Sequence, residues 1–333
     1  MKKILITGGG GYIGSHVVKF FLERGFSIVV LDNFSRGYRE PLQILSKIGS
    51  IDVEESDLLD INSVHEVFQK HDIGAVLHFA ALCIVNESVE QPELYMKNNV
   101  EGTKNLLEVM REANVEKIIF SSTCAVYGEA KILPVDENHS LQPMNPYGES
   151  KLAAENLIRQ EAEAHNLKYV IFRYFNVCGA SSDGMIGDSK KPSQLLVQNA
   201  VRGAMDIEPF SYTCADVETP DRTPIRDYID VEDLAGAHFL GFKYLDQGGA
   251  SDTFNLGNGK GYSVKEIVSE VERIFGRVME KAPTVTRKGE HAKIYADPRK
   301  AKKALQFMPK KSLTESIESL RKWYTGHPNG YKE

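Results

Sequence analysis

Residues 3–16, KILITGGGGYIGSH, decide what kind of fold this chain can form. KILIT has the composition of a short buried strand, and YIGSH opens a segment with the apolar spacing of a helix. Between them, Gly8, Gly11 and Gly14 have the spacing GxxGxxG. Glycines at such a turn permit a tight bend, close approach of the backbone to a diphosphate and close packing of helix on strand. The stretch therefore predicts a dinucleotide-binding turn at the start of an α/β fold.

Asp32 ends the second predicted strand, in VVLDN, and supports the nucleotide interpretation. A carboxylate there can accept hydrogen bonds from the adenosine ribose and would repel a 2′-phosphate, which favours NAD over NADP. Arg36 argues the other way, although it can equally be a solvated loop charge. Asp57 follows the third predicted strand and could either meet the adenine or cap the next helix, and the sequence leaves both open.

The first half of the chain repeats this alternation of short apolar strands and amphipathic helices. Strands are expected in KILIT, SIVVLD, SIDVEESD, AVLHFAA, KIIFSST and KYVIFRYF, and helices in residues 12–24, 41–47, 61–70, 92–114 and 147–165. This rhythm is typical of a parallel sheet covered on both faces, with right-handed connections. The predicted fold class is therefore α/β, with a doubly wound parallel sheet of the Rossmann type.

The rhythm changes after about residue 176, where VCGASSDGMIGDSKKPS is predicted to be a loop. Helices expected in residues 195–205, 231–245, 263–276 and 312–324 then alternate with short extended pieces. We expect residues 1–176 to form an NAD-binding domain and residues 177–333 a smaller mixed α/β substrate lobe, with some segments returning to the Rossmann sheet. Ligands of open parallel sheets bind beyond the carboxyl ends of the strands, so the cleft between the lobes is the expected site.

Composition excludes several other classes of protein. The 333 residues carry a formal charge of −6, which gives no general attraction to nucleic acid or to an anionic membrane. No apolar run approaches the roughly 20 residues of a membrane helix. The four cysteines form no CxxC pair and the nine histidines have no ligand-like spacing, so we expect neither a metal nor a disulfide framework. A reducing cytoplasm is the predicted compartment.

Tyr147 and Lys151 are four residues apart, so a helix would bring both to one face. A free phenol titrates at about 10, but a neighbouring ammonium and the positive ring of NAD⁺ would favour the phenolate. That phenolate could take a proton from a sugar hydroxyl while hydride leaves the same carbon, and Thr123, at the end of KIIFSST, could bind that hydroxyl. A lone YxxxK is also common as a surface pair, so the surrounding motifs decide its meaning.

Eight motifs occur in order across roughly residues 4–230: TGGGGYIGSH, LDN, HFAA, NNVEGT, SSTCAVYG, YGESK, RYFN and RDYI. In these the chain resembles the extended short-chain dehydrogenase/reductase family, and within it the members that epimerise UDP-sugars at C4. The resemblance continues more weakly to ADPRKA and HPNGY, and so covers nearly the whole chain. It implies a retained NAD that takes up and returns the C4 hydride, with Tyr147 as base, Lys151 tuning it, and Thr123 binding the reacting hydroxyl.

The resemblance also implies which residues contact the ligands. Those around NAD are Gly8, Gly11, Tyr12, Ile13, Gly14, Asp32, Asn33, Phe34, Ser35, Arg36, Asp57, Leu58, Phe79, Ala80, Ala81, Asn98, Tyr147, Lys151 and Phe175. Those around the UDP-sugar are Thr123, Tyr147, Asn176, Gln194, Leu195, Arg226, Arg287 and Glu290. An arginine suits a diphosphate because its planar guanidinium can donate two parallel hydrogen bonds.

Most departures from the family pattern lie on the sugar-nucleotide side. Near the cofactor, the family usually has a lysine where Cys83 follows HFAAL, and its absence removes a charge. The other departures are Asn86, Ser193, Gln194, Thr213, Cys214, Glu290 and Ile294, the last at the site expected to limit sugar size. A UDP-hexose such as UDP-glucose or UDP-galactose is the expected substrate, with UDP-N-acetylglucosamine, a UDP-pentose and UDP-glucuronate as alternatives.

Two other functions share this fold. A nucleotide-sugar dehydratase needs an acid and a base directly after the threonine, whereas Cys124 and Ala125 follow Thr123 here. A non-enzymatic NAD-binding protein has no need for Thr123, Tyr147 and Lys151 together. Members of the family usually dimerise through a four-helix bundle, and NLLEVMREANV and LAAENLIRQEA carry apolar residues at helical spacing. We therefore expect a homodimer, although these residues could merely face the sheet.

Overall fold

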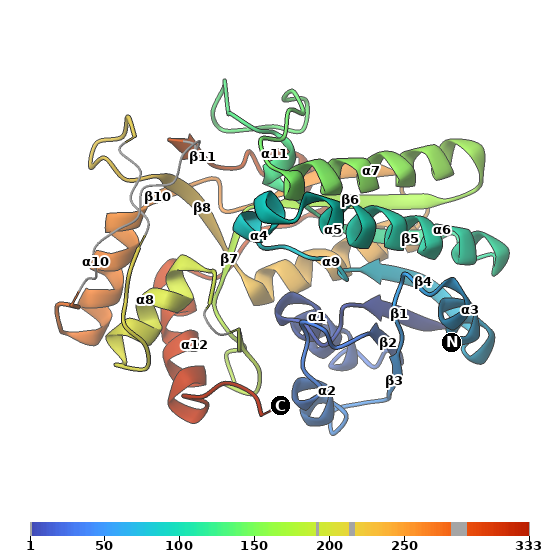
Figure 1. The fold of residues 1–333 in the computed structure, drawn as a ribbon, viewed down its shortest axis with the longest axis horizontal. Helices are drawn as coiled ribbons and strands as arrows, with labels where there is room; N and C mark the ends of the chain where they lie inside the picture. Colours follow the sequence, from blue (N-terminus) through green and yellow to red (C-terminus); the bar gives the residue numbers. More distant parts are fainter. Residues whose placement is uncertain (1, 191–192, 213–216, 281–291, 333) are drawn as a thin grey trace.

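A computed structural model of the chain describes residues 2–332 except 191–192, 213–216 and 281–291. A seven-stranded parallel sheet, in the order β3-β2-β1-β4-β5-β6-β9, crosses the molecule (Figure 1). Its strands are β1 (Lys3–Thr7), β2 (Ile28–Asp32), β3 (Ile51–Glu55), β4 (Ile73–His78), β5 (Lys117–Thr123), β6 (Lys168–Tyr174) and β9 (Asp252–Leu256). This order confirms the predicted doubly wound fold, in which strand order reverses between β1 and β4.

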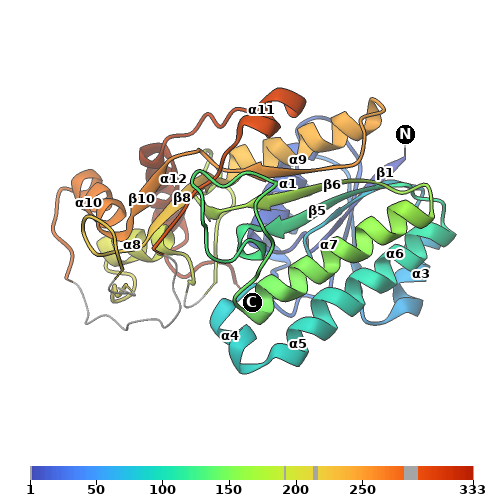
Figure 2. The same cartoon turned by 90° about the horizontal axis from the view of Figure 1, so that it is seen from above.

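Helices cover both faces of the sheet, as Figure 2 shows from above. One face carries α3 (Ile61–Lys70), α6 (Gly102–Glu112) and α7 (Pro146–Ala164), and the other carries α1 (Tyr12–Leu22) and α9 (Val231–Asp246). Successive residues of a strand pack in hydrophobic cores on opposite faces of the sheet. In β1, Ile4 and Ile6 pack with α1 and α9, whereas Leu5 packs with α3 and α6. Burial on both faces explains the near-continuous apolar strands.

The long helix expected over residues 92–114 is interrupted by a wider turn. Its parts are α5 (Pro92–Met96), a π-helical turn (Lys97–Glu101) and α6, and the short α4 (Val85–Glu90) precedes them. The turn directs Asn99 back at the loop after β4, where its side-chain oxygen accepts from Leu82 N at 2.8 Å and its amide donates to Leu82 O at 3.0 Å. The same amide donates to Ser150 Oγ at 2.9 Å. This turn therefore fixes the loop beyond β4 against α7.

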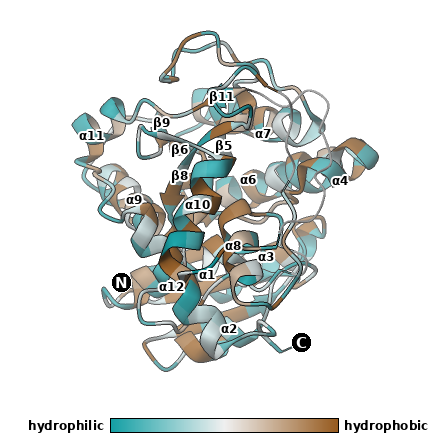
Figure 3. Cartoon of the chain, turned by 90° about the vertical axis from the view of Figure 1, so that its left-hand side faces the viewer, coloured by the Kyte–Doolittle hydropathy of each residue, from teal (hydrophilic) through white to brown (hydrophobic). Residues whose placement is uncertain are grey.

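The second half of the chain builds a smaller sheet and its own helices. β8 (Ile225–Asp230) is central, between β10 (Gly261–Ser263) and β11 (Lys293–Ile294), and also pairs with β7 (Asn176–Cys178). Helices α8 (Leu196–Ala204), α10 (Val264–Phe275) and α12 (Leu313–Gly326) gather beside it, each mixing hydrophobic and hydrophilic residues (Figure 3). In α10 the buried residues Val264, Ile267, Val268 and Val271 recur at helical spacing.

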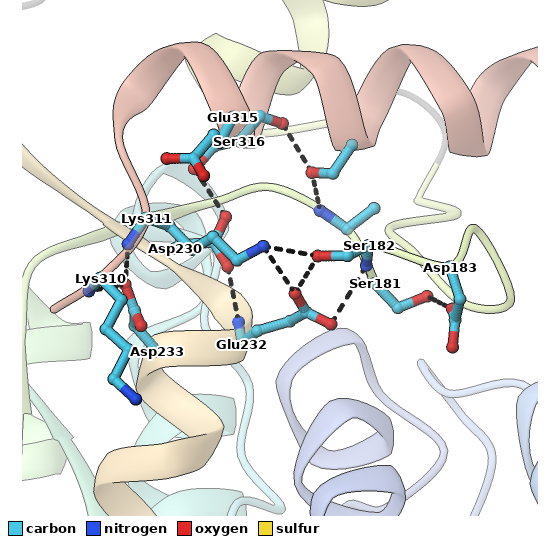
Figure 4. Close-up of polar contacts among 12 residues, drawn as sticks. Ser181, Ser182, Asp183, Asp230, Glu232, Asp233, Lys310, Lys311, Glu315 and Ser316 are labelled. Carbon is cyan, nitrogen blue, oxygen red and sulfur yellow. Dashed lines mark hydrogen bonds and ion pairs between the residues drawn. The ribbon is translucent and has the colours of Figure 1, made fainter.

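A polar network joins the two parts of the molecule (Figure 4). Asp230 ends β8 and caps α9, because its Oδ1 accepts from Glu232 N at 2.8 Å. Its Oδ2 accepts from Ser316 Oγ of α12 at 2.6 Å. Glu232 in turn accepts from Ser182 N at 3.1 Å, in the loop that follows β7. One buried carboxylate thus links a helix of the large sheet to a helix of the smaller lobe.

Candidate active site

A cavity of about 860 Å³ lies at the carboxyl ends of the strands. Its walls bring together nearly all the residues expected around the cofactor: Gly8, Gly11, Tyr12, Ile13, Gly14, Asp32, Asn33, Ser35, Arg36, Asp57, Leu58, Phe79, Ala80, Ala81, Asn98, Tyr147, Lys151 and Phe175. They come from segments after β1, β2, β3, β4, β5 and β6, as expected for a site at the carboxyl ends of a parallel sheet. Cavities of this size accommodate small ligands and cofactors.

The turn expected to bind the diphosphate requires glycine, because a side chain in it would clash with neighbouring backbone atoms. Gly8 has φ of 72°, and a Cβ there would lie 2.6 Å from Ala80 N. A Cβ on Gly14 would lie 2.2 Å from Gly8 O, so the start of α1 could not pack this closely on the turn. Tyr12 and Ile13 begin α1 and line the cavity. Backbone N–H groups in a first helical turn have no intrahelical acceptor, so they can donate to an anion.

Asp32 has the environment expected of a ribose ligand. It is 7% exposed, and its carboxylate accepts from Gly10 N at 2.9 Å and from Phe34 N at 2.8 Å. Burial is the main cause that raises the pKa of Asp32, against these two hydrogen bonds. The Arg36 guanidinium forms an ion pair with Glu87, with 2.6 Å between Nη2 and Oε1. This pairing satisfies the charge that would otherwise favour a 2′-phosphate. The geometry therefore fits NAD better than NADP.

Phe34 is an expected cofactor residue that does not line the cavity. Its ring instead packs beneath the Arg39 guanidinium, whose Cζ lies 4.2 Å from the ring centroid. Phe34 acts locally through its backbone N–H, which orients Asp32.

The open question over Asp57 has a geometric answer. Asp60 caps α3, accepting from Asn62 N at 3.2 Å and Ser63 N at 3.3 Å. Asp57 instead accepts from Asn33 Nδ2 at 2.9 Å and from Leu59 N at 2.8 Å, and it lines the cavity. Since a neighbouring aspartate caps the helix, Asp57 is free to face a ligand.

The start of α7 explains how Tyr147 and Lys151 reach the end of β5. Asn145 caps this helix by accepting from Gly148 N at 2.9 Å. A Cβ on Gly148 would lie 2.7 Å from Ala125 O, so only glycine permits this approach of α7 to the segment after β5. Lys151 is 4% exposed, and its Nζ donates to Ser121 O at 2.8 Å. Burial lowers the pKa of Lys151 to about 8.

Tyr147 and Thr123 meet at the same point of the cavity. Burial raises the pKa of Tyr147 well above its ordinary value, and a hydrogen bond with Thr123 opposes this rise. Burial is the largest influence on that pKa, and the lowering predicted from the sequence depends on the Lys151 ammonium together with the positive ring of NAD⁺. The phenol is therefore protonated at neutral pH until a ligand adds positive charge.

Glu155, one turn beyond Lys151, secures α7 against β6, although no motif in the sequence singles it out. It is fully buried, and its carboxylate accepts from Arg173 Nε at 2.9 Å and from Arg173 Nη2 at 2.6 Å. Ser122 Oγ also donates to it at 2.5 Å. This paired charge holds α7, and with it the Tyr147 phenol, in register with β5 and β6.

On the sugar-nucleotide side the structure brings together most of the expected residues. Asn176, Gln194, Leu195, Arg226, Cys83, Asn86 and Ile294 line the cavity. Ser193 is buried and donates to Asp188 Oδ2 at 3.0 Å. Thr213, Cys214, Arg287 and Glu290 lie outside the described residues.

Sequence reasoning missed several lining residues, notably Ser121, Met144, Tyr174, Asp188 and Lys190. Asp188 and Lys190 belong to the glycine- and serine-rich stretch after β7, which was treated only as a loop. Functional residues are often found on loops, so the charges of Asp188 and Lys190, between a strand and a helix, were the signal that could have identified them as site residues.

The residues that the structure describes offer neither a metal site nor a helix able to span a membrane. They contain no group of three or more His, Cys, Asp or Glu side chains that could hold a metal ion. None of their helices combines the length and the apolar character needed to cross a membrane.

This fold and cavity are those of enzymes that use a dinucleotide cofactor to modify a sugar nucleotide. Comparison with known proteins identifies the family. Residues 4–257 match the model of the NAD dependent epimerase/dehydratase family, and the chain belongs to this family. This finding confirms the family predicted from the motifs.

The particular relatives are epimerases. The chain is 42% identical over 330 residues to the UDP-glucose 4-epimerase of Halalkalibacterium halodurans, covering 98% of this chain and 97% of the relative. The structure of UDP-glucose 4-epimerase from Bifidobacterium longum in complex with NAD⁺ and UDP matches with a TM-score of 0.94 and 34% identity, over 99% and 100% of the two chains. The UDP-Glc/GlcNAc 4-epimerase of Campylobacter jejuni matches with a TM-score of 0.84 and 36% identity, over 98% and 100%.

Proposed function

We propose that this chain is a UDP-glucose 4-epimerase that keeps NAD bound while it interconverts UDP-glucose and UDP-galactose. The observation that carries the proposal is a single cavity lined by the glycine turn, by Asp32 and by Thr123, Tyr147 and Lys151. Full-length relatives named as UDP-glucose 4-epimerases support it. Bound NAD supplies the hydride acceptor and donor for C4 of the sugar.

Tyr147 moves the proton in this proposal. Its phenolate takes the proton of the 4-hydroxyl as the sugar is oxidised, and the phenol returns it when the sugar is reduced from the other face. Thr123 stabilises the same oxygen by a hydrogen bond. Lys151 holds a positive charge close to the phenolate and is itself fixed by Ser121 O. Because both half-reactions use the same groups, no proton or hydride has to leave the site.

Asn176 and Arg226 hold the UDP group while the oxidised sugar turns. Arg226 suits a diphosphate through its planar guanidinium, and both residues line the cavity. Arg287 has the same proposed role on the strength of the motif alone.

A dehydratase reaction is disfavoured by the two residues that follow Thr123. Cys124 and Ala125 both line the cavity where a dehydratase needs an acid and a base. Burial raises the pKa of Cys124 to about 12, so its thiol stays protonated and is a poor base at neutral pH.

Replacing Tyr147 with Phe tests the proposal. We expect turnover of UDP-glucose to fall by about 10²-fold or more, since this is the usual contribution of general acid–base catalysis, while the NAD content stays unchanged. Tyr169→Phe is the matched control, because Tyr169 lies on β6 and does not line the cavity. An unchanged rate in Tyr147→Phe would refute the mechanism.

A second candidate substrate is UDP-N-acetylglucosamine, favoured by Ile294. This residue of β11 is 3% exposed, lines the cavity and packs in the core cluster of Val126 and Phe175. A branched aliphatic side chain leaves more room than a large aromatic one for an N-acetyl group. The relative from Campylobacter jejuni, described as a UDP-Glc/GlcNAc 4-epimerase, fits this dual use.

For assembly, we infer a homodimer through the paired helices α5–α6 and α7. These helices lie side by side in Figures 1 and 2, and Arg111 Nη1 of α6 meets Glu161 Oε1 of α7 at 3.4 Å. Leu94 and Met96 of α5 are 39% and 41% exposed, which supplies apolar surface for a partner. A monomer at micromolar concentration in sedimentation analysis would contradict this. Within each chain, residues 1–176 are proposed as the NAD-binding domain and 177–333 as the UDP-sugar lobe, with α9 and β9 returning to the large sheet.

A further inference from the structure

Lys190 is a cation that reaches into the cavity from the substrate side of the cleft. It follows the buried Asp188 in the segment between β7 and α8, and it lines the cavity. Its Nζ donates to Cys83 Sγ at 3.4 Å. Cys83 belongs to the loop after β4, which is beside the glycine turn. The lysine side chain therefore crosses the cleft to the wall where the dinucleotide is expected.

Within the described part of the chain, the ammonium of Lys190 has no ion-pair partner. Its ammonium has the Cys83 thiol as hydrogen-bond partner, and none of the carboxylates described there comes within 4.0 Å of it. The Cys83 sulfur and the Asp188 carboxylate raise the pKa of Lys190, so the ammonium is positive at neutral pH. A thiol is a weak acceptor for a full charge. Such a site is suited to an anionic ligand.

The residues around Lys190 and Cys83 place these two side chains between the two ends of the expected dinucleotide site. On one side, Arg36 follows Asp32 after β2, and its Nη2 lies 2.6 Å from Oε1 of Glu87, four residues beyond Cys83. On the other side, Leu82, next to Cys83, donates its N–H to Asn99, which donates to Ser150 Oγ beside Lys151 on α7. A dinucleotide that spans from Asp32 to Tyr147 has its diphosphate, its anionic part, in the middle.

We propose that Lys190 binds the diphosphate of the bound dinucleotide opposite the N-terminus of α1, and so supplies from the substrate lobe the positive charge that Cys83 does not provide. The inference rests on the proposed function only in requiring NAD, and not on any particular sugar. The diphosphate is then held from both walls of the cleft, by the first-turn N–H groups of α1 and by the ammonium.

The test is the retention of NAD by the purified holoenzyme. Lys190→Met keeps the length and apolar stem of the side chain and removes its charge. We expect NAD to dissociate about tenfold faster or more on dilution, since hydrogen bonds to charged groups contribute at this level. Where the wild type purifies without NAD, the same ratio is expected in the Kd for added NAD⁺. Lys47→Met is the control, because Lys47 is exposed and does not line the cavity.

A second variant separates lost charge from a disturbed loop. In the double variant Cys83→Lys with Lys190→Met, a cation enters the same place from the opposite wall, and NAD retention should recover at least in part. Unchanged NAD dissociation in Lys190→Met would overturn the proposal. So would unchanged dissociation with a raised KM for the UDP-sugar, because the lysine would then serve the substrate. Faster NAD loss in a protein that epimerises no UDP-sugar would uphold this inference and refute the proposed function instead.

Discussion

At the scale of single residues, the site depends on a few side chains brought to the carboxyl end of β5. Thr123 is 7% exposed, and its Oγ accepts from Ala125 N at 3.1 Å while its hydrogen bond to Tyr147 opposes the rise of the phenol pKa. Burial alone would keep that phenol protonated. The hydroxyl therefore favours the phenolate in addition to binding the substrate oxygen.

Thr123→Val tests this role because it keeps the shape and removes the hydroxyl. We expect kcat to fall by about 10²-fold, as for removal of one donor to a reacting oxygen, and we expect Thr123→Ser to stay within a few-fold of wild type. Steady-state kinetics, with NAD content measured in parallel, check both. Equal rates for the Val and Ser variants would contradict the account.

The residues that sequence could predict were those inside recognisable motifs. Asp32, Tyr147 and Lys151 line the cavity as expected because motif spacing reflects backbone geometry that the fold imposes. Lys190 was missed because its contact with Cys83 joins positions 107 residues apart in the sequence. Phe34 remains a prediction from the motif: its backbone is left-handed, with φ of 53°, and its ring packs against Arg39.

At the scale of secondary-structure elements, α7 carries the catalytic pair and is anchored by a buried ion pair. Glu155 is fully buried, and the Arg173 side chain is 3% exposed. A buried carboxylate is costly to desolvate, but removing it leaves an arginine that is buried and unpaired. The anchor is thus more sensitive to substitution than the exposed ion pairs elsewhere on α7.

Glu155→Gln should lower the free energy of unfolding by about 3–5 kcal/mol, the usual effect of breaking a buried pair. Chemical denaturation followed by circular dichroism measures it. Glu163→Gln, on an exposed position of the same helix, should change the value by less than about 0.5 kcal/mol. Similar stabilities for the two variants would mean that Glu155 does not anchor α7.

Elements with strong periodicity were predictable, and those set by distant pairing were not. The first six strands and α7 follow the expected ranges within a few residues. β9 completes the large sheet by pairing with β6, and only tertiary contact reveals that Asp252–Leu256 belongs there. The π-helical turn within residues 92–114 places Asn99 in contact with Leu82, a pairing across 17 residues that local propensity does not encode.

At the scale of the whole molecule, the network around Asp230 joins the large sheet to the smaller lobe (Figure 4). Burial is the main cause that raises the pKa of Asp230 to about 7, against hydrogen bonds from Ser316 and Glu232 N. In the unfolded chain an aspartate titrates at about 3.9. Between these values the folded protein binds a proton that the unfolded chain has lost, so the contribution of Asp230 to stability falls as pH rises towards 7.

Asp230→Asn removes this titration while its amide oxygen can still cap α9 and its N–H can donate to Ser316. We expect the free energy of unfolding of the variant, relative to wild type, to increase between about pH 4 and pH 7, by up to about 1.4 kcal/mol per unit. Urea unfolding at several pH values measures the difference. Asp72→Asn, at a 76% exposed side chain, is the control. A difference independent of pH would contradict the assignment.

The central claim is that one cavity, with its own retained NAD, inverts C4 of a UDP-sugar. The most direct measurement incubates the purified protein with UDP-glucose, and separately with UDP-N-acetylglucosamine, without added cofactor, and follows the sugar protons by NMR. We predict that UDP-galactose forms from UDP-glucose until equilibrium is reached, and the second tube ranks the N-acetylated sugar against it. No C4 epimer in either tube, even after NAD⁺ is added, would contradict the claim.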